Sequence, residues 1–140
     1  MSESRIMPYL LLDPSDILNL YYTSLYGGDL CAVKELMTQE SYIMTLETFG
    51  LRLSLRDSEF KAQLKKIQED PDVLDEVENK LSVELISRNI SPKIEILTQQ
   101  WNGTKRQTIE YTEDGKSKKL YFSKEEYGWK INYYAGRKVE

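Results

Sequence analysis

Residues 94–134 read IEILTQQWNGTKRQTIEYTEDGKSKKLYFSKEEYGWKINYY, and this stretch decides the fold. It contains three turn signals between runs in which apolar and polar residues alternate. Asn102-Gly103 and Asp114-Gly115 are the dipeptides most typical of two-residue hairpin loops, and residues 125–128 fit a four-residue loop. The stretch therefore predicts four antiparallel strands joined as a meander.

The turns also predict how the strands pair, because the length of a hairpin loop sets the register. The expected pairs are Glu113 with Lys116, Glu110 with Lys119, Ile109 with Leu120, Trp101 with Thr104, Ile96 with Ile109, Ile94 with Tyr111, Phe122 with Ile131, and Leu120 with Tyr133. One face of the sheet then carries Ile94, Ile96, Ile109, Tyr111, Leu120, Phe122, Trp129, Ile131 and Tyr133. This apolar face must be covered by other elements, whereas the opposite face is more polar.

The first two thirds of the chain supply helices that can cover it. Asp13-Pro14 and Asp70-Pro71 are each an N-cap followed by proline at the first helical position. Asp29 predicts a short second helix, and Asp57 or Ser58 predicts a further one. Apolar residues repeat at helical spacing after each cap.

Two parts of this helical region are harder to interpret. Residues 38–56 fit a helix up to about Gly50, but beyond it Leu51, Leu53 and Leu55 alternate with polar residues as in a strand. Cys31 lies in the apolar pattern of the short helix, so we expect it to be a small core residue and not a reactive thiol.

The whole chain is thus expected to be α+β, with N-terminal helices packed on one face of a curved antiparallel sheet that ends in a four-stranded meander. Its 140 residues fit one domain, which we place at 13–140 after an N-terminal tail at 1–12. The N-terminus lacks a targeting signal and no apolar run is long enough to span a membrane. A single cysteine suits a reducing compartment, so we expect a cytoplasmic protein without membrane contact.

The closing segments KLYF at 119–122 and GWKINYY at 128–134 follow an opening helix, Gly28-Asp29 and a short helix. In this order the chain resembles the nuclear-transport-factor-2-like superfamily, which has a cystatin-like α+β fold. The resemblance implies an apolar pocket between sheet and helices and dimers formed through the sheet. The superfamily includes isomerases, dehydratases and binding adaptors, so it implies no single activity. Residues 38–70 depart from its pattern, because they are more helical than the hairpin usually found there.

The chemistry-bearing residues exclude several kinds of site. The chain has no histidine, one cysteine and no glycine-rich phosphate loop, so we expect no histidine-based triad, no metal site and no cofactor. The net charge of −4 does not favour nucleic-acid binding, since only the last 51 residues carry a small positive excess of +3. Although the ten tyrosines and nearby lysines could stack on single strands, most of these tyrosines fall on core stripes.

A few polar groups on the apolar face remain as a candidate pocket for a small apolar ligand. In the predicted register Thr98 pairs with Gln107 beside Phe122, and Tyr111 and Tyr133 add hydroxyls. An isomerase-like or dehydratase-like enzyme would need an inward carboxylate near these tyrosines. Glu95 and Glu110 are predicted to face outward, and Glu47 would qualify only if residues 38–56 fold unexpectedly.

The opposite, more polar face carries a second candidate site. Leu97, Tyr121, Asn132 and Tyr134 are expected there, and clustered apolar side chains on a surface indicate a contact site. We therefore expect a homodimer formed through the sheet. The sequence favours a non-catalytic module that binds a ligand or a protein, and the pocket enzyme remains the alternative.

Overall fold

Aspartate side chains begin four of the helices in the computed structural model, which describes residues 12–135. Asp13 accepts hydrogen bonds from the backbone N–H groups of Ser15 and Asp16, and Asp29, Asp57 and Asp70 cap the later helices in the same way. The elements are α2 (Pro14–Tyr26), α3 (Leu30–Glu35), α4 (Gln39–Ser54), α5 (Ser58–Leu64), α6 (Pro71–Arg88), β1 (Ile94–Trp101), β2 (Arg106–Glu113), β3 (Lys116–Glu125) and β4 (Gly128–Ile131).

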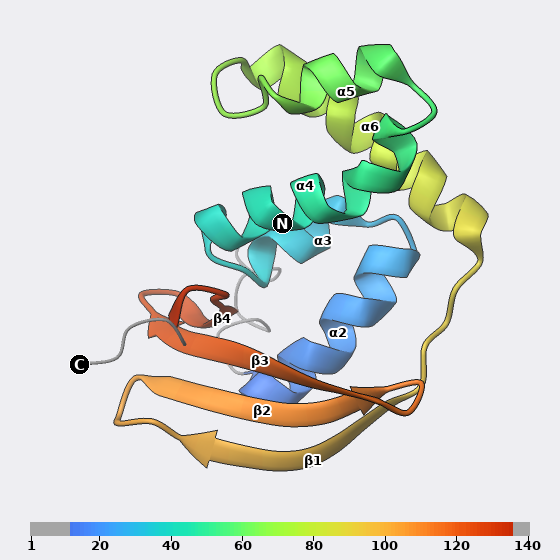
Figure 1. Cartoon of the computed structure of the whole chain (residues 1–140). Coiled ribbons are helices and arrows are strands. Elements are labelled where there is room, and N and C mark those ends of the chain that lie inside the picture. Colours follow the sequence, from blue (N-terminus) through green and yellow to red (C-terminus); the bar gives the residue numbers. More distant parts are fainter. Residues whose placement is uncertain (1–11, 136–140) are drawn as a thin grey trace, which may run out of the picture.

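The α+β class is confirmed, since within residues 12–135 five helices precede one antiparallel sheet with strand order β1-β2-β3-β4. Figure 1 shows α2 lying against the sheet, α3 and α4 above it, and α5 and α6 farthest from the strands. The predicted tail at residues 1–12 lies outside the described residues except for Leu12, which packs against the core. The single-domain assignment stays a prediction.

Helix α4 settles the ambiguous segment. It begins at Thr38, whose hydroxyl accepts a hydrogen bond from the Ser41 N–H, and it continues past Gly50 to Ser54. Leu53 packs against the core, whereas Leu51 and Leu55 are exposed, so the alternation of leucines is not a strand.

The helical region also contains one error of prediction. Cys31 is exposed, because it lies on the outer side of α3 while its neighbours Leu30 and Ala32 are buried. It is not the core residue that the apolar pattern predicted.

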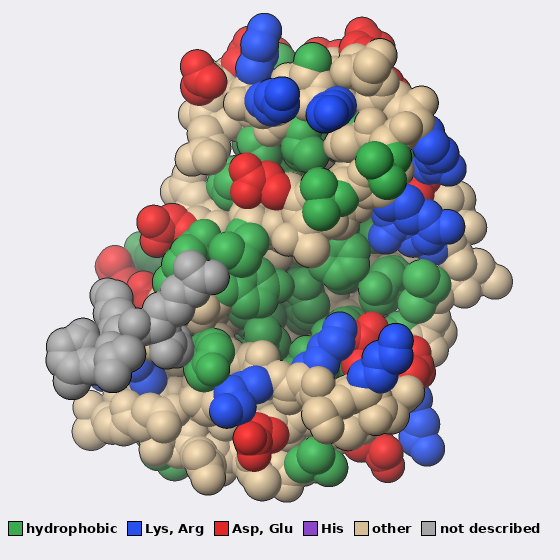
Figure 2. Space-filling model, in the orientation of Figure 1, with side chains coloured by type: hydrophobic (Ala, Val, Ile, Leu, Met, Phe, Trp, Pro, Cys, Tyr) green, Lys and Arg blue, Asp and Glu red, His purple; other side chains and the backbone are tan. Residues whose placement is uncertain are grey.

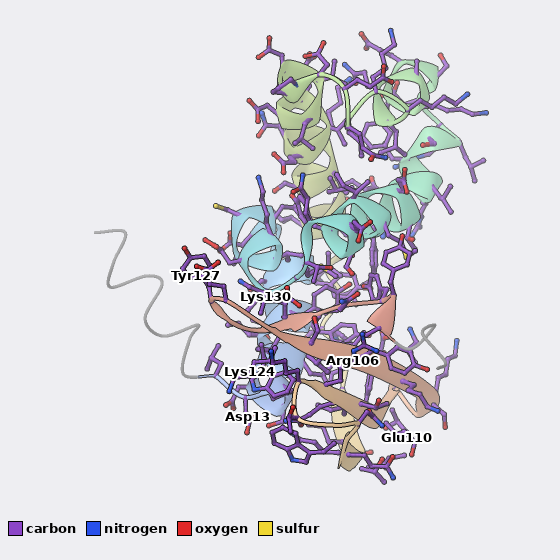
Figure 3. All side chains as sticks on the ribbon, turned by 90° about the vertical axis from the view of Figure 1, so that its left-hand side faces the viewer. Asp13, Arg106, Glu110, Lys124, Tyr127 and Lys130 are labelled. Atoms are coloured by element: carbon purple, nitrogen blue, oxygen red, sulfur yellow. The ribbon has the colours of Figure 1, made fainter. Side chains whose placement is uncertain are left out.

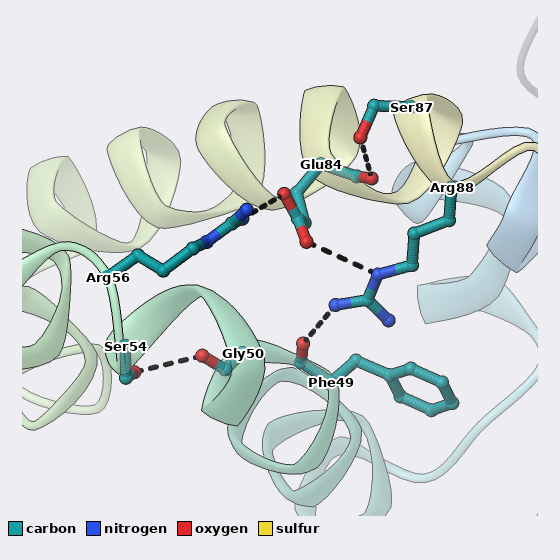
Figure 4. A network of polar contacts seen from close by, with 7 residues as sticks. All are labelled: Phe49, Gly50, Ser54, Arg56, Glu84, Ser87 and Arg88. Carbon is teal, nitrogen blue, oxygen red and sulfur yellow. Dashed lines mark hydrogen bonds and ion pairs between the residues drawn. The ribbon is translucent and has the colours of Figure 1, made fainter.

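Helix α6 is tied to the end of α4 by a polar network (Figure 4). The Glu84 carboxylate accepts from Arg56 at 2.6 Å and from Arg88 at 3.3 Å. Arg88 also donates to the Phe49 carbonyl at 3.1 Å. At the end of α6, Asn89 adopts a left-handed conformation with φ of 51°, which is typical of a residue that ends a helix.

The register is confirmed for two of the three strand pairs. Glu113 pairs with Lys116, Glu110 with Lys119, Ile109 with Leu120, and Phe122 with Ile131. The predicted pair of Leu120 with Tyr133 is wrong. After Ile131 the chain leaves the sheet, because the Tyr133 N–H bonds to the Ser41 hydroxyl of α4 at 2.9 Å.

The predicted pairing of β1 with β2 is also wrong. The loop spans residues 102–105, so Trp101 pairs with Gln107 and not with Thr104. A bulge at Leu97 then shifts the register again, and Ile96 pairs with Tyr111. An odd shift reverses the faces, so residues 98–101 point opposite to the prediction. Ile94 likewise pairs with Glu113 and not with Tyr111.

The free edge of β4 is closed by the segment between α3 and α4. Met37 forms a parallel bridge with Ile131, the Ile131 N–H donates to the Leu36 carbonyl, and the Thr38 N–H donates to the Ile131 carbonyl. The opposite edge, β1, pairs with no strand other than β2 within residues 12–135. In the described part of the chain, the sheet therefore has one protected and one open edge.

Candidate functional site: a tyrosine cluster between the helices and the sheet

Tyrosines from three parts of the chain meet on the helix-facing side of the sheet. The Tyr22 hydroxyl of α2 lies 2.7 Å from the Tyr111 hydroxyl of β2. The residue before it, Tyr21, has its hydroxyl 3.1 Å from that of Tyr133. The Tyr21 and Tyr22 rings touch edge to face, with centroids 5.0 Å apart, so the two pairs form one group. We call Tyr21, Tyr22, Tyr111 and Tyr133 the tyrosine cluster.

A carboxylate completes one end of the tyrosine cluster. The Tyr22 hydroxyl donates to Glu113 Oε1 at 3.0 Å, and Lys118 Nζ lies 2.6 Å from the same oxygen. Because Tyr22 has only one proton to donate, Tyr111 donates to Tyr22 in this arrangement. The hydroxyls thus form a directed chain from Tyr111 through Tyr22 to Glu113.

At the other end, the Tyr133 hydroxyl lies 3.2 Å from the Thr45 hydroxyl of α4. The Thr45 hydroxyl also bonds to the Ser41 carbonyl at 3.0 Å. Helices α2 and α4, strand β2 and the segment after β4 are therefore joined through side-chain oxygens. These polar atoms are buried without being left unsatisfied.

Burial holds the hydroxyls of Tyr21, Tyr22 and Tyr111 in their neutral form. Desolvation, followed by the neighbouring Tyr133, raises the pKa of Tyr21, and desolvation followed by the bond to Tyr111 raises the pKa of Tyr22. Desolvation also raises the pKa of Tyr111 to about 12. The three phenols therefore keep their protons at neutral pH and can act there as hydrogen-bond donors.

The open side of the tyrosine cluster is aromatic. Tyr22 stacks at 6.5 Å on Tyr26, and Tyr26 meets Phe49 of α4 edge to face at 6.1 Å. Both of these outer rings are only half-buried. Figure 2 shows hydrophobic side chains gathered in a hollow between the helices and the sheet, in the region where Figure 1 places α4 above β3.

A separate pocket of about 310 Å³ adjoins α2. It lies between α2 and the connection from α6 to β1, and Tyr22, Tyr26 and Ile94 are among its lining residues. Its size is at the lower end of the range for small-molecule sites. The Tyr22 and Tyr26 rings thus border open space as well as the tyrosine cluster.

The predicted pocket residues do not form one site. Tyr111 and Tyr133 both belong to the tyrosine cluster, although they contact different partners. Gln107 is buried on the same face but pairs with Trp101 and bonds to Gln99 at 2.7 Å. Thr98 donates to Glu110 at 2.9 Å on the opposite face, because the bulge and the longer loop reverse its direction.

The residues predicted for the opposite face are also divided. Leu97 is 60% exposed at the bulge, and Tyr121 is half-buried opposite Thr108. The Asn132 amide, directly after β4, donates to the Ser123 hydroxyl of β3. Tyr134 lines a pocket against α4 and α6, because the chain has left the sheet there. Figure 3 labels Arg106 and Glu110, two charged residues of β2, and Glu110 lines a shallow pocket together with Leu97.

Glu113 is the site residue that sequence reasoning missed. Tyr111 was placed on the apolar face, and Glu113 follows it by two residues, so alternation puts both side chains on one face. The inward position of Glu113 was not predicted, because this residue precedes a turn and charged residues at turns are usually solvated.

Two expectations concern absence. Among residues 12–135, no three acidic or cysteine side chains converge in a way that could hold a metal ion. In the same part of the chain, every helix is too short or too polar to cross a membrane.

Comparison of the chain with protein-family models, curated proteins and solved structures finds no match. The nuclear-transport-factor-2-like resemblance therefore stays a prediction.

Proposed function

We propose that the protein is a non-catalytic module that binds a small, largely apolar ligand against the tyrosine cluster. The observation that carries this proposal is the pocket of about 310 Å³ that Tyr22 and Tyr26 line, with the Tyr22 hydroxyl bonded to that of Tyr111. Binding sites for small molecules combine an apolar lining with a few polar groups that orient the ligand. The Tyr26 and Phe49 rings would supply the first, and the tyrosine hydroxyls the second.

Binding is favoured over catalysis by the state of the polar groups. The raised pKa values of Tyr21, Tyr22 and Tyr111 make these phenols weaker acids than usual, so they are poorly suited to deliver a proton. Glu113 is already held by Lys118 at 2.6 Å. Since the Tyr111 and Tyr22 protons are already donated within the tyrosine cluster, the hydroxyl oxygens serve better as fixed acceptors for a donor group of a bound ligand.

The alternative is a pocket enzyme of the isomerase or dehydratase type. It is supported by one observation, the inward Glu113 carboxylate at 3.0 Å from Tyr22. In that function Glu113 would accept a proton from a bound substrate, and a tyrosine hydroxyl would stabilise the resulting oxyanion. Release of Glu113 from Lys118 would be required first.

We also propose that two copies associate through the sheet and that the protein acts in the cytoplasm. The exposed Leu97 and the open edge of β1 support the association, because an unpaired strand edge with apolar side chains is prone to pairing. Tyr121 lies on the same sheet and is included in the contact. The resemblance to the nuclear-transport-factor-2-like superfamily, which we retain as a proposal, implies the same mode of dimerisation.

Fluorescence of 1-anilinonaphthalene-8-sulfonate tests the ligand site. We expect the folded protein to enhance the emission of this dye, and we expect Phe49→Ala to weaken binding about tenfold through loss of one ring contact. Leu51→Ala is the matched control, because Leu51 is on the same helix but exposed.

Circular dichroism must show that both variants remain folded. Equal affinities of wild type and both variants would place the dye elsewhere and contradict the proposed ligand site. No enhancement with the wild type would contradict it as well.

A further inference from the structure

A second, larger pocket lies on the helical side of the molecule, apart from the tyrosine cluster. Its volume is about 520 Å³, and it is formed by α4, the connection from α5 to α6, and the segment after β4. Its apolar surface comes from Ile43, Met44, Ile67, Pro71, Leu74 and Tyr134. Ile67 is buried, while most of the other apolar side chains are half-buried and remain accessible to a ligand.

The rim of this groove is acidic. Glu40 and Glu47 lie along α4, and Glu69 lies on the opposite wall just before α6. All three are exposed, and none forms an ion pair with another residue of the described chain. The rest of the lining within residues 12–135 contains no lysine or arginine. Within residues 12–135, the groove therefore presents three negative charges without a positive partner around an apolar floor.

The spacing along α4 matches an extended peptide. Glu40 and Glu47 are seven residues apart, which is nearly two helical turns and a rise of about 10 Å on one side of the helix. Ile43 and Met44 lie between them on that side. Because an extended polyproline II segment has three residues per turn and rises about 3.1 Å per residue, two positions three residues apart lie on one side of a bound peptide and span about the same distance.

We propose that this groove docks an extended segment of a protein partner in which two arginine or lysine residues, three positions apart, flank apolar side chains. The basic groups face Glu40 and Glu47, and the apolar side chains enter the groove over Ile43 and Met44. Glu69 provides a third contact from the opposite wall. Arginine suits this arrangement best, since its guanidinium can bond a carboxylate in a bidentate manner.

The charge pattern distinguishes this groove from a general apolar patch. Carboxylates that face one another across a groove repel, so a cation between them relieves that repulsion as well as forming its own contacts. The contacts are exposed to water, and we therefore expect binding in the micromolar range that weakens with added salt.

Fluorescence anisotropy with the chain of residues 1–140 and a fluorescein-labelled peptide Gly-Arg-Ile-Leu-Arg-Gly tests this proposal. We expect saturable binding to the wild type. The double variant Glu40→Gln/Glu47→Gln should bind about tenfold more weakly, because it loses two exposed charge contacts worth roughly threefold each. The control Glu95→Gln/Glu126→Gln changes the net charge equally at exposed positions on the sheet, and it should bind as the wild type does.

A second peptide, with alanine in place of isoleucine and leucine, should also bind more weakly, because it loses apolar contacts with Ile43 and Met44. Equal weakening by both double variants would mean non-specific attraction to an acidic protein and would overturn the proposal. Binding seen only after removal of residues 136–140 would show that the chain's own basic end competes for the groove, which contradicts a groove open to a partner. Loss of dye binding at the tyrosine cluster would leave this result unaffected, so the two proposals fail separately.

Discussion

Replacement of Phe60 by alanine is expected to lower the free energy of unfolding by about 3–5 kcal/mol. Phe60 is fully buried in α5, and its ring packs against Gly50 of α4, where a Cβ atom would lie only 3.1 Å from the Phe60 Cε2 atom. The variant loses the transfer energy of the ring and leaves a cavity between α4 and α5. Urea unfolding followed by circular dichroism measures the difference.

Leu55→Ala is the control for this prediction. Leu55 is close in sequence but 87% exposed, so its truncation should change stability by less than about 0.5 kcal/mol. Similar stabilities of the two variants would mean that α5 does not pack on α4 as described.

The second large effect is expected from Glu84, the carboxylate that joins α4 to α6. Glu84→Ala removes hydrogen bonds to two arginines and leaves Arg88, whose side chain is largely buried, with only the Phe49 carbonyl. We expect a loss of about 2–3 kcal/mol, which is typical of hydrogen bonds to charged groups. Thermal unfolding at neutral pH measures this loss of stability. Figure 4 shows the bonds from Arg56 and Arg88 to the Glu84 carboxylate that the variant removes.

The same network predicts how the difference depends on pH. Burial alone would raise the pKa of Glu84, but the hydrogen bonds and charges of Arg56 and Arg88 outweigh it and hold the pKa below 4.5. A lowered pKa in the folded state means that Glu84 stabilises the fold above pH 4.5 and that this contribution is lost as the pH falls through the lowered value. The free energies of unfolding of the wild type and of Glu84→Ala should therefore become similar at acidic pH.

Glu59→Ala serves as the control, since the Glu59 side chain is 78% exposed and lies 3.5 Å from Lys80. Such a surface pair contributes little, so we expect a change within about 0.5 kcal/mol at any pH. A Glu84→Ala variant as stable as Glu59→Ala at neutral pH would contradict the role assigned to the network.

The elements that sequence reasoning placed correctly are those with strong local signals. Capping aspartates, each followed by a proline, mark the starts of α2 and α6. The Asp114-Gly115 turn fixes the register of β2 with β3, because a two-residue loop leaves no freedom in pairing.

The errors arose where longer-range packing decides. Asn102-Gly103 opens into a four-residue loop, in which the Asn102 N–H bonds to the Arg106 carbonyl and the Asn102 side chain accepts from Thr108. Together with the bulge at Leu97 this moves Thr98 to the other face. Neither change has a signal in the dipeptide itself, since an Asn-Gly sequence is compatible with both loops.

The candidate site was predicted in part. Tyr111 and Tyr133 were placed on the helix-facing side by alternation and by the final loop, respectively, and both contribute to the tyrosine cluster. Their partners Tyr21 and Tyr22 lie on α2, and which helical residues meet which strand depends on how α2 crosses the sheet. That crossing is set by tertiary packing and cannot be obtained from periodicity alone.

Native mass spectrometry of the freshly purified protein with one equivalent of 1-anilinonaphthalene-8-sulfonate tests the central claim most directly, because it reports ligand binding and assembly together. We predict a dimer that carries one dye molecule per chain, and we predict that Tyr121→Glu gives a monomer that still binds the dye. Val83→Glu, at an exposed position of α6, should remain dimeric. A wild-type monomer without bound dye would contradict the account of this protein as a binding module that dimerises through its sheet.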